Sequence, residues 1–209
     1  MNIPIAYDDD WLLIVDKPSG LLSVPSDKKA SRTLSGILNE EFKRNDPAAH
    51  LYPCHRLDKE TSGLIVFAKS KPVQEKMMLL FKERRVKKTY LAFLQGSLSK
   101  DAGQVNSAIE GLSAQTKFKV LERKNGFSIV EAEPLTGRTN QLRLHFKFLK
   151  HPVIGEAKFV FRRDFPLRSK RLLLHAKSLD FIHPVTGKQI SIKAARPEYF
   201  EKFLKEHNR

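Results

Sequence analysis

The densest group of polar side chains in the sequence lies at residues 55–63, HRLDKETSG, directly before an apolar run at 64–68. Binding and catalytic groups concentrate on loops of this kind, which a rigid strand holds in place. Asp58 is flanked by Arg56 and Lys59, whose positive charges favour the ionised form of its carboxyl group. An ionised carboxylate acts as a nucleophile or as a base. An aspartate in a turn also accepts backbone N–H groups, so composition alone leaves both roles open.

A second polar group lies at residues 136–145, TGRTNQLRLH, where a glycine turn leads into a predicted helix. Arg138, Gln141 and His145 are spaced to share one helical face. Arg143 is displaced from that face and is expected to point elsewhere, toward a carboxylate. Arginine suits a phosphate or a bidentate pair with a buried carboxylate. An ordinary charged helix surface explains the same pattern.

Other kinds of catalytic site find little support in the sequence. The histidines form no HExxH pair or comparable metal-binding motif, and there is no G-x-S-x-G, Walker A or G-x-G-x-x-G motif. We therefore expect no metal site and no bound nucleoside triphosphate or dinucleotide. Cys54 is the only cysteine, which excludes an internal disulfide. It lies beside His55, but a lone cysteine is most often an inert core residue.

Hydrophobic periodicity predicts the elements that position these groups. The apolar runs at 11–15 and 64–68 read as strands, the first of them stopped by a turn at 16–20. Further strands are predicted at 88–95, 115–122, 127–134, 172–174 and 190–193. Helices are predicted at 32–44, from Pro72 onward, at 139–149 and at 197–207. Strands that follow one another without strict alternation with helices indicate an α+β fold, with a mixed, largely antiparallel sheet flanked by helices. Residues 1–209 read as a single domain.

The charge of the chain points to a polyanionic partner. Its 209 residues carry 38 Lys+Arg against 23 Asp+Glu, a formal net charge of +15, and nucleic acid is the leading candidate. Two basic clusters stand out: Lys82, Arg84, Arg85, Lys87 and Lys88, and Arg162, Arg163, Arg168, Lys170 and Arg171. Either cluster alone is equally well explained as a solvated face, but together they favour a surface that binds phosphates. No apolar run reaches the roughly 18 residues of a membrane span, and no signal peptide is recognised, so we expect a cytoplasmic monomer.

Residues 55–64, HRLDKETSGL, resemble the signature motif of the RluA-type RNA pseudouridine synthases. Five further motifs of that family are matched in order along nearly the whole chain. They are DKPSGL at 16–21, KTY at 88–90, TGRTNQLR at 136–143, HPVIGE at 151–156 and RLLLHA at 171–176. One such motif is weak evidence, whereas six in the expected order are strong.

The resemblance implies a pseudouridine-synthase-like catalytic domain, an isomerase that converts uridine in structured RNA to pseudouridine without cofactor or metal. Asp58 would be the catalytic carboxylate, attacking at C1′ of the ribose or C6 of the base. Tyr90 would stack on the target ring, although a strand tyrosine is also commonly a core residue. Arg143 would pair with Asp58, and Arg56 would fill the space left by the flipped uridine.

Two departures from the family pattern accompany the resemblance. Asn140 stands where histidine is usual, which puts one local hydrogen bond in doubt, and the stretch 104–116 is short. No separate RNA-binding domain is expected before residue 12. A compact member of this kind would act on a tRNA anticodon stem-loop, on ribosomal RNA, or on both.

The catalytic domain would then bind RNA through its own basic side chains. The expected contacts besides Arg56 are Lys88, Arg84, Arg85, Arg138, Arg162 and Arg163. The alternative is a non-catalytic RNA-binding protein that uses the same surface. A third reading, a carboxylate-dependent hydrolase of another substrate, has less support.

Overall fold

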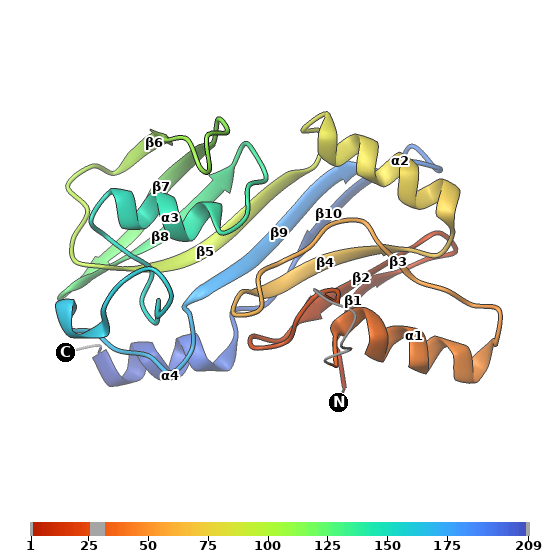
Figure 1. Ribbon diagram of the computed structural model, residues 1–209, viewed down its shortest axis with the longest axis horizontal. Coiled ribbons are helices and arrows are strands. Elements are labelled where there is room, and N and C mark those ends of the chain that lie inside the picture. The colour runs from red at the N-terminus through yellow and green to blue at the C-terminus, as the bar shows by residue number, and fades with distance from the viewer. Residues whose placement is uncertain (1, 26–31, 208–209) are drawn as a thin grey trace. The chain divides into compact units, whose positions relative to one another are not determined.

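The structure is a computed structural model that describes residues 2–25 and 32–207 (Figure 1). The chain forms two compact units. Unit 1 holds the residues up to Lys87 together with Ser178–Ala194, and unit 2 holds Lys88–Lys177 and the residues from Ala195 onward. Strand β9 (Leu174–Ile182) gives its first residues to unit 2 and the remainder to unit 1.

In unit 1 the strands lie in the order β1-β2-β4-β9, with β3 beside β4 and β10 beside β9. The new strands are β1 (Ile5–Asp8), β2 (Leu12–Lys17), β3 (Tyr52–Pro53), β4 (Ser62–Ala68) and β10 (Gln189–Lys193). The β1–β2, β2–β4, β3–β4 and β9–β10 pairs are antiparallel. Every residue of β4 is buried, as expected for a strand covered on both faces.

Two helices flank these strands on opposite sides, α1 (Leu34–Asn45) and α2 (Lys71–Lys82) (Figure 1). Thr33 caps α1, because its side-chain oxygen accepts the N–H of Gly36 at 3.1 Å. Pro72 lies in the first turn of α2, where its missing N–H costs nothing. The apolar stripe of α2 packs on one face of β2 and β4. That core contains Val73, Met77 and Leu80 of the helix and Leu12, Ile14, Leu64 and Val66 of the strands.

In unit 2 the strands lie in the order β9-β5-β8-β7-β6. Their bounds are β5 (Lys87–Gln95), β6 (Ala102–Asn106), β7 (Gln115–Lys124) and β8 (Phe127–Pro134), and the β5–β8, β7–β8 and β6–β7 pairs are antiparallel. The helical elements are α3 (Gln141–Phe148), α4 (Glu198–His207) and the short 3-10 helix η1 (Arg162–Asp164).

Alternate side chains of β5 belong to two different cores of unit 2. Ala92 and Leu94 pack with Leu142 and Phe146 of α3. Leu91 and Phe93 pack instead with Phe200 and Phe203 of α4. Successive side chains of a strand point to opposite faces, so α3 and α4 cover opposite faces of β5.

The structure confirms the α+β fold class and every helix predicted from periodicity, with ends shifted by a few residues. Two predictions about strands were inaccurate. Strand β2 continues through Asp16 and Lys17, because these residues pair with Leu64 and Gly63 of β4. The strand predicted at 172–174 overlaps β9 only at Leu174. The polar residues of β9 obscure its apolar pattern in the sequence. Strands β1, β3 and β6 were not predicted.

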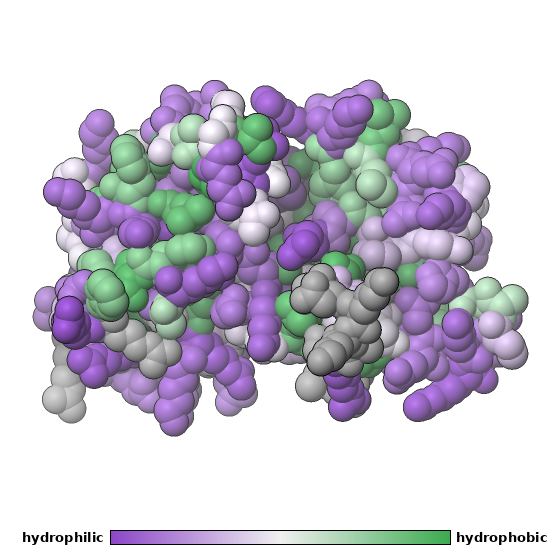
Figure 2. Space-filling view, in the orientation of Figure 1, coloured by the Kyte–Doolittle hydropathy of each residue, from purple (hydrophilic) through white to green (hydrophobic). Residues whose placement is uncertain are grey.

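Hydrophilic side chains occupy most of the surface visible in Figure 2, as the charge of the chain leads one to expect. Among the described residues, no helix combines the length and apolar character needed to cross a membrane.

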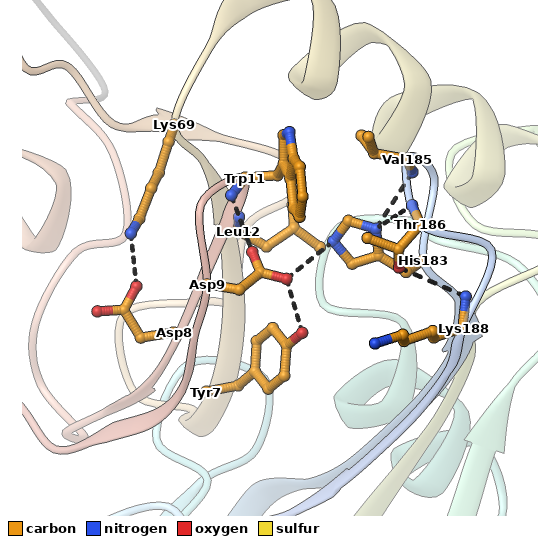
Figure 3. A network of polar contacts seen from close by, with 10 residues as sticks. All are labelled: Tyr7, Asp8, Asp9, Trp11, Leu12, Lys69, His183, Val185, Thr186 and Lys188. Carbon is orange, nitrogen blue, oxygen red and sulfur yellow. Dashed lines mark hydrogen bonds and ion pairs between the residues drawn. The ribbon is translucent and has the colours of Figure 1, made fainter.

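In unit 1, a polar network joins the β1–β2 turn to the turn after β9 (Figure 3). Asp9 accepts the backbone N–H groups of Trp11 and Leu12 at 2.9 and 2.7 Å and the Tyr7 hydroxyl at 2.7 Å. His183 Nδ1 accepts the backbone N–H groups of Val185 and Thr186. The hydrogen of the neutral ring therefore lies on Nε2, which is 3.2 Å from Asp9 Oδ2.

These contacts fix the ionisation of Asp9 and its neighbour Tyr7. Burial raises the pKa of Asp9, but the hydrogen bonds from Tyr7, Leu12 and Trp11 outweigh it and bring the pKa below the ordinary value. Burial and the bond to Asp9 raise the pKa of Tyr7 to about 12. Asp9 is therefore ionised and Tyr7 neutral over the whole physiological range.

We predict that Asp9→Ala lowers the free energy of unfolding by about 2 kcal/mol, because it removes an ionised acceptor from three donors. Urea unfolding at pH 7 measures the change. Because the pKa of folded Asp9 is lowered, its contribution is present above about pH 3.9 and is lost as pH falls through the folded value. Asp10→Ala, which changes an exposed neighbour, is the control; an equal loss in both variants would contradict the role of the network.

Candidate active site

Asp58 lies in unit 1, on the loop between β3 and β4, and is half-buried. Its carbonyl oxygen accepts the N–H of Thr61 at 3.1 Å, which closes a turn directly before β4. The preceding residue, Leu57, is held at both of its backbone groups by Ser23, whose Oγ accepts the N–H at 3.0 Å and donates to the carbonyl at 2.7 Å. The backbone on both sides of Asp58 is thus fixed by hydrogen bonds.

The segment that follows β2 supports the Asp58 loop through hydrogen bonds. Gly20, at φ +90°, donates its N–H to the carbonyl of Lys59 at 2.8 Å, and Ser19 donates its hydroxyl to the carbonyl of Glu60 at 2.7 Å. The motif at 16–21 therefore supports the loop of Asp58 through contacts between segments about 40 residues apart in the sequence.

Lys17 is the centre of this support. Its side chain is 0% exposed, and its Nζ donates to the carbonyl oxygens of Pro18 at 3.1 Å, Leu21 at 2.8 Å and Lys59 at 3.2 Å. Three donors meet three acceptors, so the buried ammonium is fully satisfied.

The charge of Lys17 is balanced by nearby carboxylates. Burial lowers its pKa to about 8, while the negative charges of Glu60, Asp58 and Asp16 oppose that shift. At neutral pH the ammonium is protonated, and its attraction to Asp58 favours the ionised form of that carboxylate. Lys17 was not predicted as a site residue, although it lies within the motif at 16–21.

Cys54 and His55 precede Asp58 in the same loop. Cys54 is buried, and burial raises the pKa of its thiol to about 12, which confirms an inert core cysteine. His55 accepts the N–H of Val66 through Nε2 at 3.0 Å. The raised pKa keeps the Cys54 thiol protonated at neutral pH, so it is a poor nucleophile.

Tyr90 and Arg143 lie in unit 2. Tyr90 is half-buried on β5, opposite Ala132 of β8, at the edge of the core beneath α3. Arg143, on α3, is 3% exposed. Its pairing with Asp58 stays a prediction.

Arg143 forms a buried ion pair with Glu156. Arg143 Nε and Nη2 donate to Glu156 Oε2 and Oε1 at 2.6 and 2.8 Å, a buried bidentate pair. Burial raises the pKa of Glu156, but the Arg143 bonds and the N–H groups of Lys158 and Phe159 outweigh it, so the pKa is lowered. The expectation that Arg143 points toward a carboxylate is confirmed, and Glu156 was missed because it had no recognised role in its motif.

Asn140 and Gly155 complete this arrangement. Asn140 adopts a left-handed conformation at φ 54°, which asparagine tolerates, and its Oδ1 accepts from Arg143 Nη1 at 3.0 Å. Asn140, which stands where the family usually has histidine, therefore makes a hydrogen bond with Arg143. Gly155 has φ +86°, and a Cβ there would lie 2.1 Å from the carbonyl oxygen of Arg171, so only glycine fits before Glu156.

The helical face expected for Arg138, Gln141 and His145 was wrong for the arginine. Arg138 precedes α3, and its side chain is exposed and donates to the carbonyl of Ser113 at 3.1 Å. Gln141 and His145 are buried and both bond the hydroxyl of Thr116, at 3.0 and 2.9 Å. They anchor α3 to β7.

Residues 11–148 match the family model described as RNA pseudouridylate synthase. The chain is 39% identical over 209 residues to the dual-specificity RNA pseudouridine synthase RluA of Haemophilus influenzae, covering 92% of each chain. The chain belongs to the RNA pseudouridine synthases. The resemblance to the RluA type is thereby confirmed.

Further relatives agree with this family. The tRNA pseudouridine synthase C of Vibrio parahaemolyticus is 31% identical over 231 residues, covering 93% of this chain and 91% of its own. Among solved structures, human RNA pseudouridylate synthase domain containing 4 is similar with a TM-score of 0.83 and 25% identity, covering 98% of this chain and 93% of that one.

The basic residues expected to bind RNA are, where described, mostly open to solvent. Arg56, Arg84 and Arg85 are exposed in unit 1. In unit 2, Arg163 is exposed and its guanidinium lies 5.3 Å from the ring centre of Phe161. Lys88 is half-buried, and burial lowers its pKa.

The side chain of Arg162 lies outside the described residues. Across residues 2–25 and 32–207, no cluster of three or more His, Cys, Asp or Glu side chains could hold a metal ion.

We predict that Lys17→Met lowers the free energy of unfolding at pH 7 by about 3 kcal/mol, because three buried carbonyls lose their donor. The unfolded chain binds more protons than the folded one between pH 8 and the ordinary pKa of 10.5. Wild-type stability relative to the variant should therefore rise across that window, by up to about 1.4 kcal/mol per pH unit. Urea unfolding at pH 7, 8.5 and 9.5 measures this, with exposed Lys59→Met as control; a difference independent of pH would contradict it.

A second prediction concerns the buried pair in unit 2. Glu156→Ala should destabilise the protein by about 3–5 kcal/mol, since it leaves the Arg143 guanidinium buried without its carboxylate. Glu131→Ala removes a half-exposed ion pair with Lys177, at 2.9 Å, and should cost no more than about 1 kcal/mol. Thermal and urea unfolding measure the two losses of stability. Equal losses in the two variants would contradict a larger contribution from the buried Arg143–Glu156 pair.

Proposed function

We propose that this pseudouridine synthase converts specific uridines of structured RNA to pseudouridine, with Asp58 as the catalytic carboxylate. The observation that carries the proposal is the loop of Asp58: a family motif, fixed at the backbone on both sides and charge-balanced by buried Lys17. A catalytic group held in this way needs no rearrangement before it reacts.

The reaction balances without an oxidant, reductant or metal. The bond between uracil N1 and ribose C1′ breaks, and a bond between C5 and C1′ forms. Asp58 attacks at C1′ or at C6, and its carboxylate is released when the new bond is complete. N1 gains a proton and C5 loses one, so substrate and product are isomers.

Three further side chains support the proposal by analogy with the family motifs. Arg143 would pair with Asp58 in addition to Glu156. Tyr90 would stack on the target base, a contact typically worth about 1–3 kcal/mol. Arg56, which is exposed, would occupy the space of the flipped uridine, and flipping is required because the reacting atoms are inaccessible in a stacked helix.

The proposed substrates are tRNA, ribosomal RNA, or both. The similar proteins of Haemophilus influenzae and Vibrio parahaemolyticus are named for dual specificity and for tRNA. The net charge of +15 supports an RNA partner, because each phosphate neutralised by Lys or Arg releases counterions. Exposed Arg84, Arg85, Arg138 and Arg163, together with Lys88 and Arg162, are the proposed contacts. We propose that the chain acts in the cytoplasm as a monomer and as one catalytic domain.

The alternative is a non-catalytic RNA-binding protein with the same basic surface. It predicts RNA binding without any change in the RNA, and it gives Asp58 no function. The two therefore differ in the product and not in the affinity for RNA.

We predict that Asp58→Asn abolishes pseudouridine formation while RNA affinity stays within a few-fold, because the amide is no nucleophile and phosphate contacts supply the affinity. The assay is tritium release from uridine labelled at C5, using tRNA and ribosomal RNA from cells that lack the gene. Filter binding on the same RNA measures the affinity.

Asp10→Asn, an exposed carboxylate of the same unit, is the matched control and should release tritium at the wild-type rate. Unchanged release by Asp58→Asn would remove Asp58 from the mechanism. Tight binding by wild-type protein with no release would favour the binding protein.

A further inference from the structure

The segment that follows the Arg143–Glu156 pair carries aromatic rings between basic side chains. Phe159 is half-buried, and the guanidinium carbon of Arg143 lies 5.1 Å from the centre of its ring. The ammonium nitrogen of exposed Lys158 also lies 5.1 Å from that ring centre. Glu156 accepts the N–H groups of Lys158 and Phe159 at 2.8 and 3.3 Å. The start of this segment is therefore fixed to the buried pair.

Two residues further on, Phe161 is exposed to solvent. It is 70% exposed, and the guanidinium carbon of Arg163 lies 5.3 Å from the centre of its ring. The N–H of Asp164 donates to the carbonyl of Phe161 at 3.1 Å and closes the turn of η1, which contains Arg163. The backbone that carries the ring is thus held by a hydrogen bond, so binding a flat partner would order little more than the side chain.

Exposure alone does not assign a function to Phe161, because single exposed apolar side chains are common at protein surfaces. Its surroundings do distinguish it. Ile5 is 56% exposed, but three carboxylates follow it at residues 8–10. Phe161 instead lies in the segment 157–171, which has six Lys or Arg and one Asp. The basic residues of the segment are Lys158, Arg162, Arg163, Arg168, Lys170 and Arg171.

The one acidic residue of the segment leaves this charge largely available. Asp164 Oδ1 lies 3.8 Å from Arg163 Nε, and the two side chains are 52% and 83% exposed. An ion pair that is so long and so exposed contributes little. An open ring among available cations suits a partner with flat faces and negative charges, and single-stranded nucleic acid has both.

We propose that Phe161 and Arg163 form a stacking platform for an unpaired base of the RNA, other than the uridine that is isomerised. The base lies on the open part of the Phe161 ring, and a neighbouring phosphate lies against the Arg163 guanidinium. The target uridine is assigned to Tyr90, so Phe161 receives a different base. The proposal rests on the proposed function for its partner, RNA, and does not depend on the chemistry of Asp58.

The place of the platform in the chain sets which part of the RNA it contacts. Two residues of chain span at most about 7 Å, so the Cα of Phe161 lies within that distance of the Cα of Phe159. The ring of Phe159 lies against Arg143, which is the proposed partner of Asp58. The stacked base therefore belongs to a nucleotide near the target uridine, and Phe161 is a positioning residue that touches no reacting atom.

The test uses a short hairpin RNA with an unpaired loop and no uridine, so that no position can be isomerised. A matched series replaces one loop nucleotide at a time by an abasic ribose, which keeps the phosphate and removes the ring. Fluorescence anisotropy at fixed salt measures the affinity of the full-length protein. At one loop position, removal of the base should weaken wild-type binding at least about fivefold, as expected for a base stacked on an aromatic side chain.

Variants of Phe161 show whether its ring is the partner of that base. Phe161→Ala should bind the intact hairpin at least about fivefold more weakly than wild type and should lose less than about twofold on removal of the same base. Phe161→Tyr keeps a ring and should behave like wild type. Ile5→Ala, an exposed apolar side chain in acidic surroundings, is the matched control and should also behave like wild type. Equal urea midpoints for all of these proteins show that the fold is intact.

The salt dependence of binding separates the ring from the charge. Arg163→Gln should reduce the slope of log affinity against log salt by about 0.7, the value for one phosphate contact on a single strand. Phe161→Ala should leave that slope unchanged, because it removes no charge.

The proposal is overturned if wild type shows no base-dependent position, if Phe161→Ala keeps the full loss there, or if Phe161→Tyr binds like Phe161→Ala. It is also overturned if Phe161→Ala binds RNA normally but loses self-association in sedimentation, which would assign the ring to a second copy of the chain. Tritium release is scored separately. Stacking as described with no release by wild type would reject the isomerase and keep the platform, whereas release without ring-dependent binding would reject the platform alone.

Discussion

The active-site loop depends on one buried ammonium group. Lys17 is removed from water, yet each of its three donors meets a backbone carbonyl, one of them from Lys59 next to Asp58. Burying a charge is costly unless it is fully bonded and balanced. Here the three bonds and the nearby carboxylates offset that cost, and the bond to Lys59 ties the loop to the end of β2. The Asp58 loop is thus held in place by contacts within unit 1.

Unit 2 also contains a buried cation whose N–H groups are bonded, the guanidinium of Arg143. The Arg143 guanidinium is buried, and Glu156 and Asn140 occupy three of its N–H directions. Glu156 in turn is fixed by two backbone N–H groups and by the close approach of the chain at Gly155. An arginine held in this way is a rigid donor. If Arg143 also pairs with Asp58, as we propose, both partners of that pair are oriented by their own surroundings.

Local sequence patterns were sufficient to predict much of the fold and the loop that carries Asp58. The apolar run at 64–68 and the charges beside Asp58 identified the loop, and helical spacing placed α3. The patterns did not predict features that depend on contacts between residues distant in the sequence. Strand β9 is polar at several positions and is stabilised by pairing with β10. The roles of Lys17 and Glu156 depend on partners that lie 42 and 13 residues away, which no local pattern shows.

We propose that Asp58 converts uridine to pseudouridine in cellular RNA. Mapping pseudouridines in tRNA and ribosomal RNA tests it most directly, in cells with the gene, without it, and with the gene restored as wild type or as Asp58→Asn. The account predicts that particular sites lose pseudouridine on deletion, regain it with the wild-type gene and stay unmodified with the variant. Restoration by Asp58→Asn, or a map that is unchanged by deletion, would contradict it.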